Sequence, residues 1–162
     1  MGKVISLGAL GRVRARLRRE GRRVVFTNGT FDILHRGHVE YLAAARKMGD
    51  VLIVGLNSDA SIRRIKGPRR PINPLADRAA VLASLASVDF VCVFGADTPY
   101  ALIRRLVPDV LVKGADWKHK GIVGSDVVER AGGAVRTVRL TPGRSTTNVI
   151  ERVLGAYAGG AR

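Results

Sequence analysis

Cysteine is almost absent from this 162-residue sequence, because Cys92 is its only cysteine. A lone cysteine excludes an internal disulfide and a cysteine-based zinc site, and within the apolar run 88–94 it is typical of a buried strand residue.

Long apolar runs are missing too, since none approaches the ~20 residues that span a membrane. The first residues show neither the apolar core nor the cleavage site of a secretory signal. We therefore expect a cytoplasmic protein with no membrane partner.

Acidic and aromatic residues are also scarce. The 28 Lys and Arg residues outnumber the 13 Asp and Glu, which gives a formal net charge of +15. A basic balance suits nucleic acids, acidic membranes or anionic small substrates. Aromatic residues make up only 5% of the sequence and form no RNA-binding pattern, so we expect no nucleic-acid partner.

The first 23 residues are rich in arginine and follow a helical pattern. Four apolar residues have the spacing of one helix face: Leu7, Leu10, Val13 and Leu17. The arginines fall mostly on the opposite face, where solvation is favoured over a nucleic-acid role. We predict a basic helical extension over residues 1–23, a single domain over residues 24–157 and a frayed tail at residues 158–162.

Three common motifs of nucleotide and acyl chemistry are absent. The sequence has no G-x-x-x-x-G-K-[ST] phosphate loop, no G-x-G-x-x-G after the first expected strand and no G-x-S-x-G nucleophile elbow. These absences argue against the usual kinase or GTPase machinery and against NAD binding. The chemistry that remains is the positioning of phosphates without a protein nucleophile.

Apolar strands alternate with helical segments along the chain. The expected strands are Val24–Thr27, Val51–Leu56, Val88–Phe94, Val110–Lys113 and Ala134–Leu140. The expected helices are Gly37–Met48, Pro74–Ser87, Thr98–Val107, Ser125–Ala131 and Ser145–Ala156. This alternation predicts an α/β fold with a single Rossmann-like, doubly wound parallel sheet of about five strands. Ligands of such sheets bind beyond the carboxyl ends of the strands.

The segment TNGTFDILHRGH, residues 27–38, follows the first expected strand at that edge. It places a small-residue turn before a helix and two of the three histidines, His35 and His38, at the start of the helix. A helix start offers unpaired N–H groups and a positive dipole end, which suit an anion. Two imidazoles there are able to donate hydrogen bonds to phosphate oxygens during phosphoryl or nucleotidyl transfer. The alternative is a plain helix start with surface histidines.

Three other segments suit a nucleotide. The segment 143–147 is a second glycine turn before a helix, in which Arg144 and Ser145 are able to bind phosphate oxygens. The alternative for Ser145 is that it serves only as an N-cap. The strand that ends near Lys113 leads to Trp117, which either packs in the core or stacks on a base. Residues 57–74 form an arginine-rich segment that we expect to be a loop, either solvated or phosphate-grasping.

The sequence resembles the cytidylyltransferase-like nucleotidyltransferase superfamily and, within it, the bacterial D-glycero-β-D-manno-heptose 1-phosphate adenylyltransferases. The resemblance spans Val24 to Val153 and rests on the segments TNGTFDILHRGHVEYL, VGLNSDAS, KGPRRPINPLADR, DTPYALI, PDVLVKGADW and GRSTT. It implies that AMP passes from ATP to a heptose 1-phosphate, giving ADP-heptose and pyrophosphate, with Mg²⁺ assisting. It also implies a free-standing transferase without a kinase half, a small-molecule sugar phosphate as partner, and a homodimer or larger homo-oligomer.

The same resemblance implies roles for individual residues. His35 and His38 stabilise the transition state at the α-phosphate, and Lys66 and Arg78 neutralise phosphate charge. The nucleotide and acceptor are further bound by Thr30, Phe31, Asp32, Lys113, Asp116, Trp117, Arg144, Ser145 and Thr146. No cluster of acidic side chains is expected to hold the metal, because triphosphate oxygens and water provide most of the ligands of Mg²⁺.

Two alternatives stay open. Cytidylyltransferases that act on glycerol phosphate or related polyol phosphates share the H-x-G-H and S-T-T elements but commonly carry an arginine where this chain has Leu140. This difference favours ATP over CTP. The second alternative is a nucleic-acid-binding module that keeps the fold, binds in a salt-dependent way and does not need the histidines.

Overall fold

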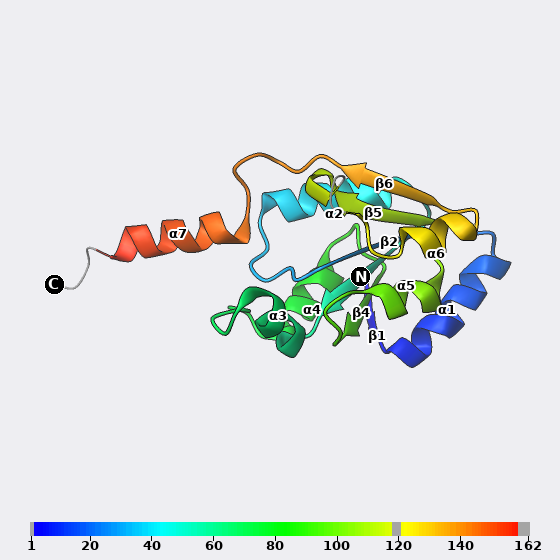
Figure 1. The fold of residues 1–162 in the computed structure, drawn as a ribbon, viewed down its shortest axis with the longest axis horizontal. Coiled ribbons are helices and arrows are strands. Elements are labelled where there is room, and N and C mark those ends of the chain that lie inside the picture. The colour runs from blue at the N-terminus through cyan, green and yellow to red at the C-terminus, as the bar shows by residue number, and fades with distance from the viewer. Residues whose placement is uncertain (1, 118–120, 159–162) are drawn as a thin grey trace.

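A single parallel sheet organises the chain. The structure, a computed structural model, describes residues 2–117 and 121–158, with only the backbone of Trp117. In these residues six strands lie in the order β1-β4-β3-β2-β5-β6, and every neighbouring pair is parallel (Figure 1). The strands are β1 (Lys3–Ile5), β2 (Val24–Gly29), β3 (Val51–Asn57), β4 (Phe90–Phe94), β5 (Val110–Gly114) and β6 (Ala134–Val138).

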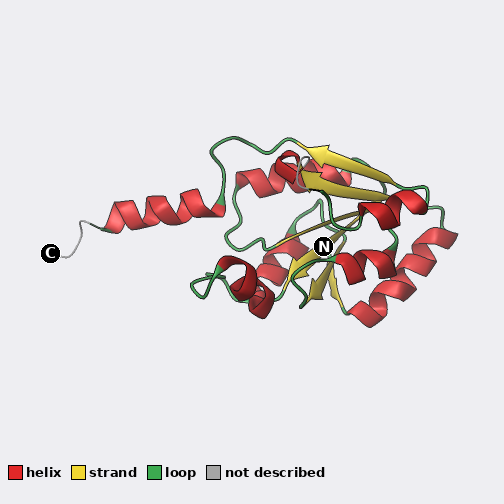
Figure 2. Cartoon of the chain, viewed as in Figure 1, coloured by secondary structure: helices red, strands yellow, loops and turns green. Residues whose placement is uncertain are grey.

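Helices cover both faces of this sheet (Figure 2). They are α1 (Leu7–Arg19), α2 (Arg36–Arg46), α3 (Asp59–Lys66), α4 (Leu75–Ser84), α5 (Tyr100–Leu106), the 3₁₀ turn η1 (Ala115–Trp117), α6 (Ser125–Arg130) and α7 (Thr146–Tyr157). One apolar cluster joins α2 and α4 to the sheet, and a second joins α1, α5 and α6 to its other face. Side chains of consecutive strand residues point to opposite faces, so Val25 enters the first cluster and Phe26 the second. The doubly wound α/β prediction is confirmed.

The sixth strand was not expected from the sequence. Strand β1 pairs with β4 from Lys3↔Phe90 to Ile5↔Cys92. Ser6 then caps α1 by accepting a hydrogen bond from the backbone N–H of Ala9, and the α1 residues Leu10 and Leu17 are buried in the second cluster. The first residues of the chain therefore contribute an edge strand and a core helix to the same sheet.

The loop expected over residues 57–74 is wrong for its first half, which is helix α3. Ser58 caps this helix by accepting a hydrogen bond from the N–H of Ser61, and Ile62 within the helix is fully buried. Gly67, at a φ of 94°, ends the helix. Ser58 is a typical N-cap residue and could have predicted the helix, but the arginines and prolines that follow it in the sequence favoured a loop.

The strand order places a crevice next to β2. The chain moves outward from β2 to β3 and β4, and then returns to the other side of β2 as β5. Ligands bind at such a reversal, beyond the carboxyl ends of the strands. Helix α7 leaves the body at this end and extends away from it (Figure 1), and none of its residues is buried.

We predict that Gly55 in β3 is required by close packing. A Cβ atom there would lie 2.8 Å from Cζ of Phe26 and 3.1 Å from Cβ of Asn28. Gly55→Ala is expected to lower the free energy of unfolding by about 1–3 kcal/mol, because the Phe26 ring has to move within a packed core. Urea denaturation measures this loss. The matched control is Gly155→Ala in α7, where a Cβ meets nothing within 4 Å; an equal loss there contradicts the prediction.

Candidate functional site

A cleft of about 640 Å³ opens at the carboxyl ends of the strands, beside β2 and β5. Ten residues singled out from the sequence line it: Thr30, Phe31, His35, His38, Lys66, Lys113, Asp116, Arg144, Ser145 and Thr146. They come from the ends of two strands, the starts of α2 and α7, the end of α3 and the turn η1. The fold therefore brings together side chains that are more than 100 positions apart in the sequence.

Two stacked histidines stand where α2 begins. His35 is the N-cap residue, in an extended conformation with φ −142°, and His38 lies in the first turn. Their ring centroids are 3.9 Å apart, and the Phe31 ring lies 5.2 Å from that of His38. The Nδ1 atoms of both histidines are buried and have no hydrogen-bond partner among the described residues. Buried polar atoms without partners are uncommon, so this pair is suited to a polar ligand.

Both imidazoles are neutral near pH 7. Burial, and to a lesser extent the neighbouring His35, lower the pKa of His38 to about 4. Burial also lowers the pKa of His35, helped by the positive charge of Arg144. A neutral imidazole carries one N–H donor and one acceptor nitrogen. The pair is thus arranged to donate hydrogen bonds rather than to supply two fixed positive charges.

A buried lysine lies at the base of the cleft. Lys113, at the end of β5, is 8% exposed and donates a hydrogen bond to Oδ1 of Asn28, at the end of β2. Burial lowers the pKa of Lys113 to about 8, and the carboxylate of Asp116 partly opposes this shift. The amine is therefore mostly charged at pH 7 and provides a fixed cation between the two central strands.

The start of α7 forms another wall. Ser145 caps α7, because its Oγ accepts a hydrogen bond from the N–H of Asn148. Arg144 packs closely against α2, since a Cβ on Gly37 would lie 3.1 Å from Cβ of Arg144. Two helix starts, with their unpaired N–H groups, thus line the same cleft. This arrangement suits an anion with several negative charges.

The far wall is built from the ends of β3, α3 and β4. Asn57 ends β3, Lys66 ends α3, and Asp97 follows β4. Sequence reasoning missed Asn57 and Asp97, and also Asn28 and Tyr41, which all line the cleft. The positions of Asn28 and Asn57 at strand ends were a usable signal. Tyr41 lies within a helix, and only tertiary packing brings it to the site.

Asp32 does not line the cleft but holds the segment that leads into α4. Its buried carboxylate accepts hydrogen bonds from Nε of Arg70 and from the backbone N–H groups of Ile72 and Asn73. Burial alone would raise the pKa of Asp32, but these hydrogen bonds outweigh burial and keep the pKa below its usual value. In this structure the Asp32 carboxylate is therefore occupied by structural contacts, and its contact with acceptor or metal stays a prediction.

Arg78 also lies outside the cleft lining, beneath the β2 turn. Its guanidinium donates to the carbonyls of Thr30, Asn57 and Asn73 and pairs with Asp59. The Arg78 side chain is 0% exposed, so in this structure it fixes the ends of β2 and β3, and its contact with a phosphate stays a prediction. The base-stacking role expected for Trp117 concerns a side chain outside the described residues.

We predict that Arg78→Ala destabilises the fold by about 3–5 kcal/mol, because it leaves three carbonyls without this donor, removes the ion pair with the half-buried Asp59 and empties a buried position. Guanidinium denaturation measures the change. Arg63→Ala, on the exposed side of α3, is the matched control and is expected to have little effect. A stable Arg78→Ala protein that has lost only ligand affinity would support a direct phosphate contact instead.

His38 is expected to make stability depend on pH. Its pKa is about 4 in the folded chain and 6.5 ordinarily, so the unfolded state binds more protons between these values and stability falls as the pH is lowered. From pH 7 to pH 5 this loss amounts to about 2 kcal/mol. Urea denaturation at the two pH values measures it. The variant His38→Asn should lose correspondingly less, and an unchanged pH dependence would contradict the assignment.

Known proteins resemble this chain over most of its length. Residues 26–152 match the family model described as Cytidylyltransferase-like. The bifunctional protein HldE of Trichlorobacter lovleyi is 52% identical over 96% of this chain, and that of Gluconacetobacter diazotrophicus is 58% identical over 89%. This chain spans only 32% and 30% of those two proteins.

Solved structures show the same likeness. The lipopolysaccharide core biosynthesis protein of Thermoplasma volcanium has a TM-score of 0.60 and 29% identity, over 75% of this chain and 98% of that one. A pantoate-beta-alanine ligase from Francisella tularensis shares the fold, with a TM-score of 0.63 and 17% identity, over 98% of this chain and 78% of that one. On the family match and these identities, the chain belongs to the cytidylyltransferase-like family.

Proposed function

We propose that this chain transfers AMP from ATP to a sugar 1-phosphate, with heptose 1-phosphate as the acceptor, and releases ADP-heptose and pyrophosphate. One observation carries the proposal: a stacked histidine pair with unpartnered buried Nδ1 atoms at a helix start, facing a cleft with a buried lysine. The relatives support it, since they include bifunctional HldE proteins and a lipopolysaccharide core biosynthesis protein. The product would then be a precursor of lipopolysaccharide.

In this proposal the two substrates occupy different walls of the cleft. The triphosphate lies between the starts of α2 and α7, against His35, Arg144 and Ser145, where N–H groups and positive charge meet. The sugar phosphate lies against the ends of β3, α3 and β4, where Lys66 neutralises its phosphate and Asp97 accepts hydrogen bonds from hydroxyl groups. Both halves of the cleft share β2, so the acceptor approaches the α-phosphorus from the β3 side.

The proposed reaction is an in-line displacement. An oxygen of the sugar phosphate attacks the α-phosphorus of ATP, a new P–O bond forms, and the bond to the bridging oxygen breaks as pyrophosphate leaves. The acceptor oxygen is already anionic, so no general base is needed. His35 and His38 donate hydrogen bonds to the α-phosphate oxygens, which gain negative charge in the transition state. The remaining contribution is alignment of the two phosphates.

Mg²⁺ fits this cleft as an ion carried by the triphosphate. The described residues contain no group of three or more His, Cys, Asp or Glu that would hold a metal, and the carboxylates that line the cleft are Asp97 and Asp116. Magnesium commonly binds through phosphate oxygens, waters and one or two carboxylates. We propose Asp116 as the protein carboxylate nearest the nucleotide, with Mg²⁺ supplying charge neutralisation.

The location and assembly of the protein are part of the proposal. No helix among the described residues is long and apolar enough to cross a membrane, and we propose a cytoplasmic enzyme because the relatives suggest a biosynthetic role. The homodimer or larger assembly expected from the sequence stays a prediction. Helix α7 is a candidate contact for it, because Leu154 and Tyr157 are largely exposed.

Pyrophosphate release with Mg²⁺ tests the proposed function. ATP and CTP are each offered with heptose 1-phosphate and with glycerol 3-phosphate, and turnover is expected only with ATP and the heptose. Turnover only with CTP would support a cytidylyltransferase instead, an alternative that Leu140 disfavours. Silence in all four pairings would overturn both.

The histidines provide the mechanistic test. His35→Ala and His38→Ala are each expected to lower kcat by at least about 100-fold, because each removes a donor to the charge that develops on the phosphate. Circular dichroism should show that both variants fold. Arg12→Ala, on the exposed face of α1, is the matched control and should keep full activity. Full activity in a double-histidine variant would rule out the mechanism.

A further inference from the structure

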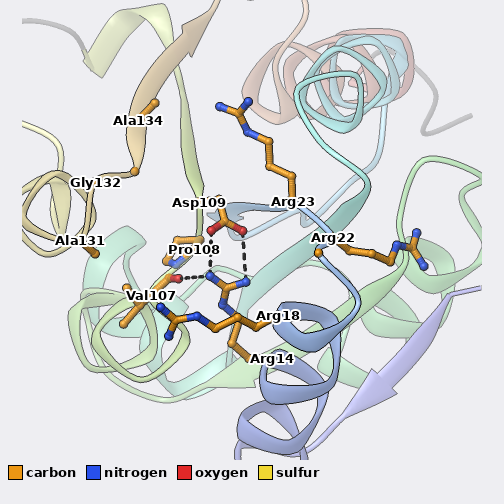
Figure 3. A pocket seen from close by; sticks show the side chains of 12 residues that line it. Arg14, Arg18, Arg22, Arg23, Val107, Pro108, Asp109, Ala131, Gly132 and Ala134 are labelled. Carbon is orange, nitrogen blue, oxygen red and sulfur yellow. Dashed lines mark hydrogen bonds and ion pairs between the residues drawn. The ribbon is translucent and has the colours of Figure 1, made fainter.

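A second pocket, of about 530 Å³, lies at the opposite end of the strands from the cleft. Its walls come from the last turn of α1, the segment that enters β2, the segment before β5 and the turn between α6 and β6 (Figure 3). Strand β2 runs through six residues from this end to the cleft. At about 3.3 Å per residue, the two sites are roughly 20 Å apart.

The lining of this pocket carries an excess of positive charge. Four arginines, Arg14, Arg18, Arg22 and Arg23, and one aspartate, Asp109, line it. Asp109 is already engaged, because it accepts two hydrogen bonds from Arg14 and one from the backbone N–H of Val24. Like charges gathered in a concave wall focus a positive potential toward an anion.

The four arginines are not equivalent. Arg14 is fully committed to the fold, since it also donates to the carbonyls of Leu106 and Val107. Arg22 points away from the Arg14–Asp109 pair (Figure 3) and donates to the carbonyl of Asp50.

Arg18 and Arg23 remain for a ligand. They flank the Arg14–Asp109 pair from two sides (Figure 3), and neither side chain forms a hydrogen bond or ion pair with another described residue.

We propose that this pocket binds the phosphate group of a small anionic ligand, between Arg18 and Arg23 and above the Arg14–Asp109 pair. Guanidinium groups match the oxygens of phosphate with paired N–H donors. The volume is that of a small-molecule site. The described lining has no aromatic side chain on which a nucleobase would stack, which favours a small phosphate over a nucleic-acid strand.

Two glycines at the rim report on binding. Gly21 and Gly132 line the pocket, both have positive φ angles, and a Cβ atom at either position would meet nothing within 4 Å. Gly29 and Gly114 line the cleft instead, so the amides of the two glycine pairs report on different sites. The two sites are therefore observable separately in one ¹H–¹⁵N NMR titration.

The test is a titration of the full chain with inorganic pyrophosphate. Saturable shifts are expected at Gly21 and Gly132, and the double variant R18A/R23A should bind at this pocket at least about tenfold more weakly, because charge-assisted hydrogen bonds are lost. The shifts at Gly29 and Gly114 and the rate of turnover should not change. The matched control is R12A/R19A, which removes two arginines of α1 that do not line this pocket and should bind like the unmodified chain.

Three results would overturn the proposal. The first is the absence of a saturable shift at Gly21 and Gly132 up to about 10 mM pyrophosphate, which would mean that any affinity is weaker than millimolar. The second is equal weakening in both double variants, which would indicate general attraction to a basic surface. The third is a response only to a single-stranded oligonucleotide, which would indicate a nucleic-acid surface.

A repeat with glucose 1-phosphate distinguishes a free phosphate from a phosphate ester, and tighter binding of either supports the site.

Discussion

The pairing of β2 with β3 on one side and β5 on the other is the constraint on which the rest of the structure depends. Backbone hydrogen bonds in these two ladders place the ends of three strands side by side. Asn28 then meets Lys113, and the chain leaving β2 must turn into α2 directly above them. Parallel strands require long crossovers, so helices cover both faces and leave only the strand ends open to a ligand.

Burial sets the charges at this open edge. Burial lowers the pKa values of both histidines and of Lys113. The imidazoles are therefore neutral near pH 7, whereas the Lys113 amine stays mostly charged. In the proposed complex, neutral imidazoles leave the negative charge of the triphosphate to be matched by the helix starts and by Lys113, Lys66 and Arg144. Donors that are fixed in advance need little rearrangement when charge develops on a phosphate, which is the usual origin of such catalysis.

The two ends of the sheet use arginine in different ways. At the carboxyl edge, Arg78 is buried and directs its donors to three carbonyls and a carboxylate, so it shapes the turn and does not line the cleft. At the amino edge, Arg14 clamps α1 to the segment before β5, whereas Arg18 and Arg23 remain on the pocket wall. The arginines of this chain therefore fall into two groups, those that hold the fold together and those that are available to a ligand. Only the hydrogen-bond partners of each guanidinium show to which group an arginine belongs.

The sequence alone determined the α/β class, five of the strands and the H-x-G-H helix start, because apolar periodicity and glycine turns are local properties. It also identified ten residues that line one cleft, through motifs at strand ends and helix starts. Tertiary structure decided what no local pattern encodes. Strand β1 has only three residues and exists because β4 offers it an edge. Asp32 and Arg78 were expected to contact ligands, but in the structure they are buried against partners, most of which lie about 20 to 50 positions away, and they support the scaffold.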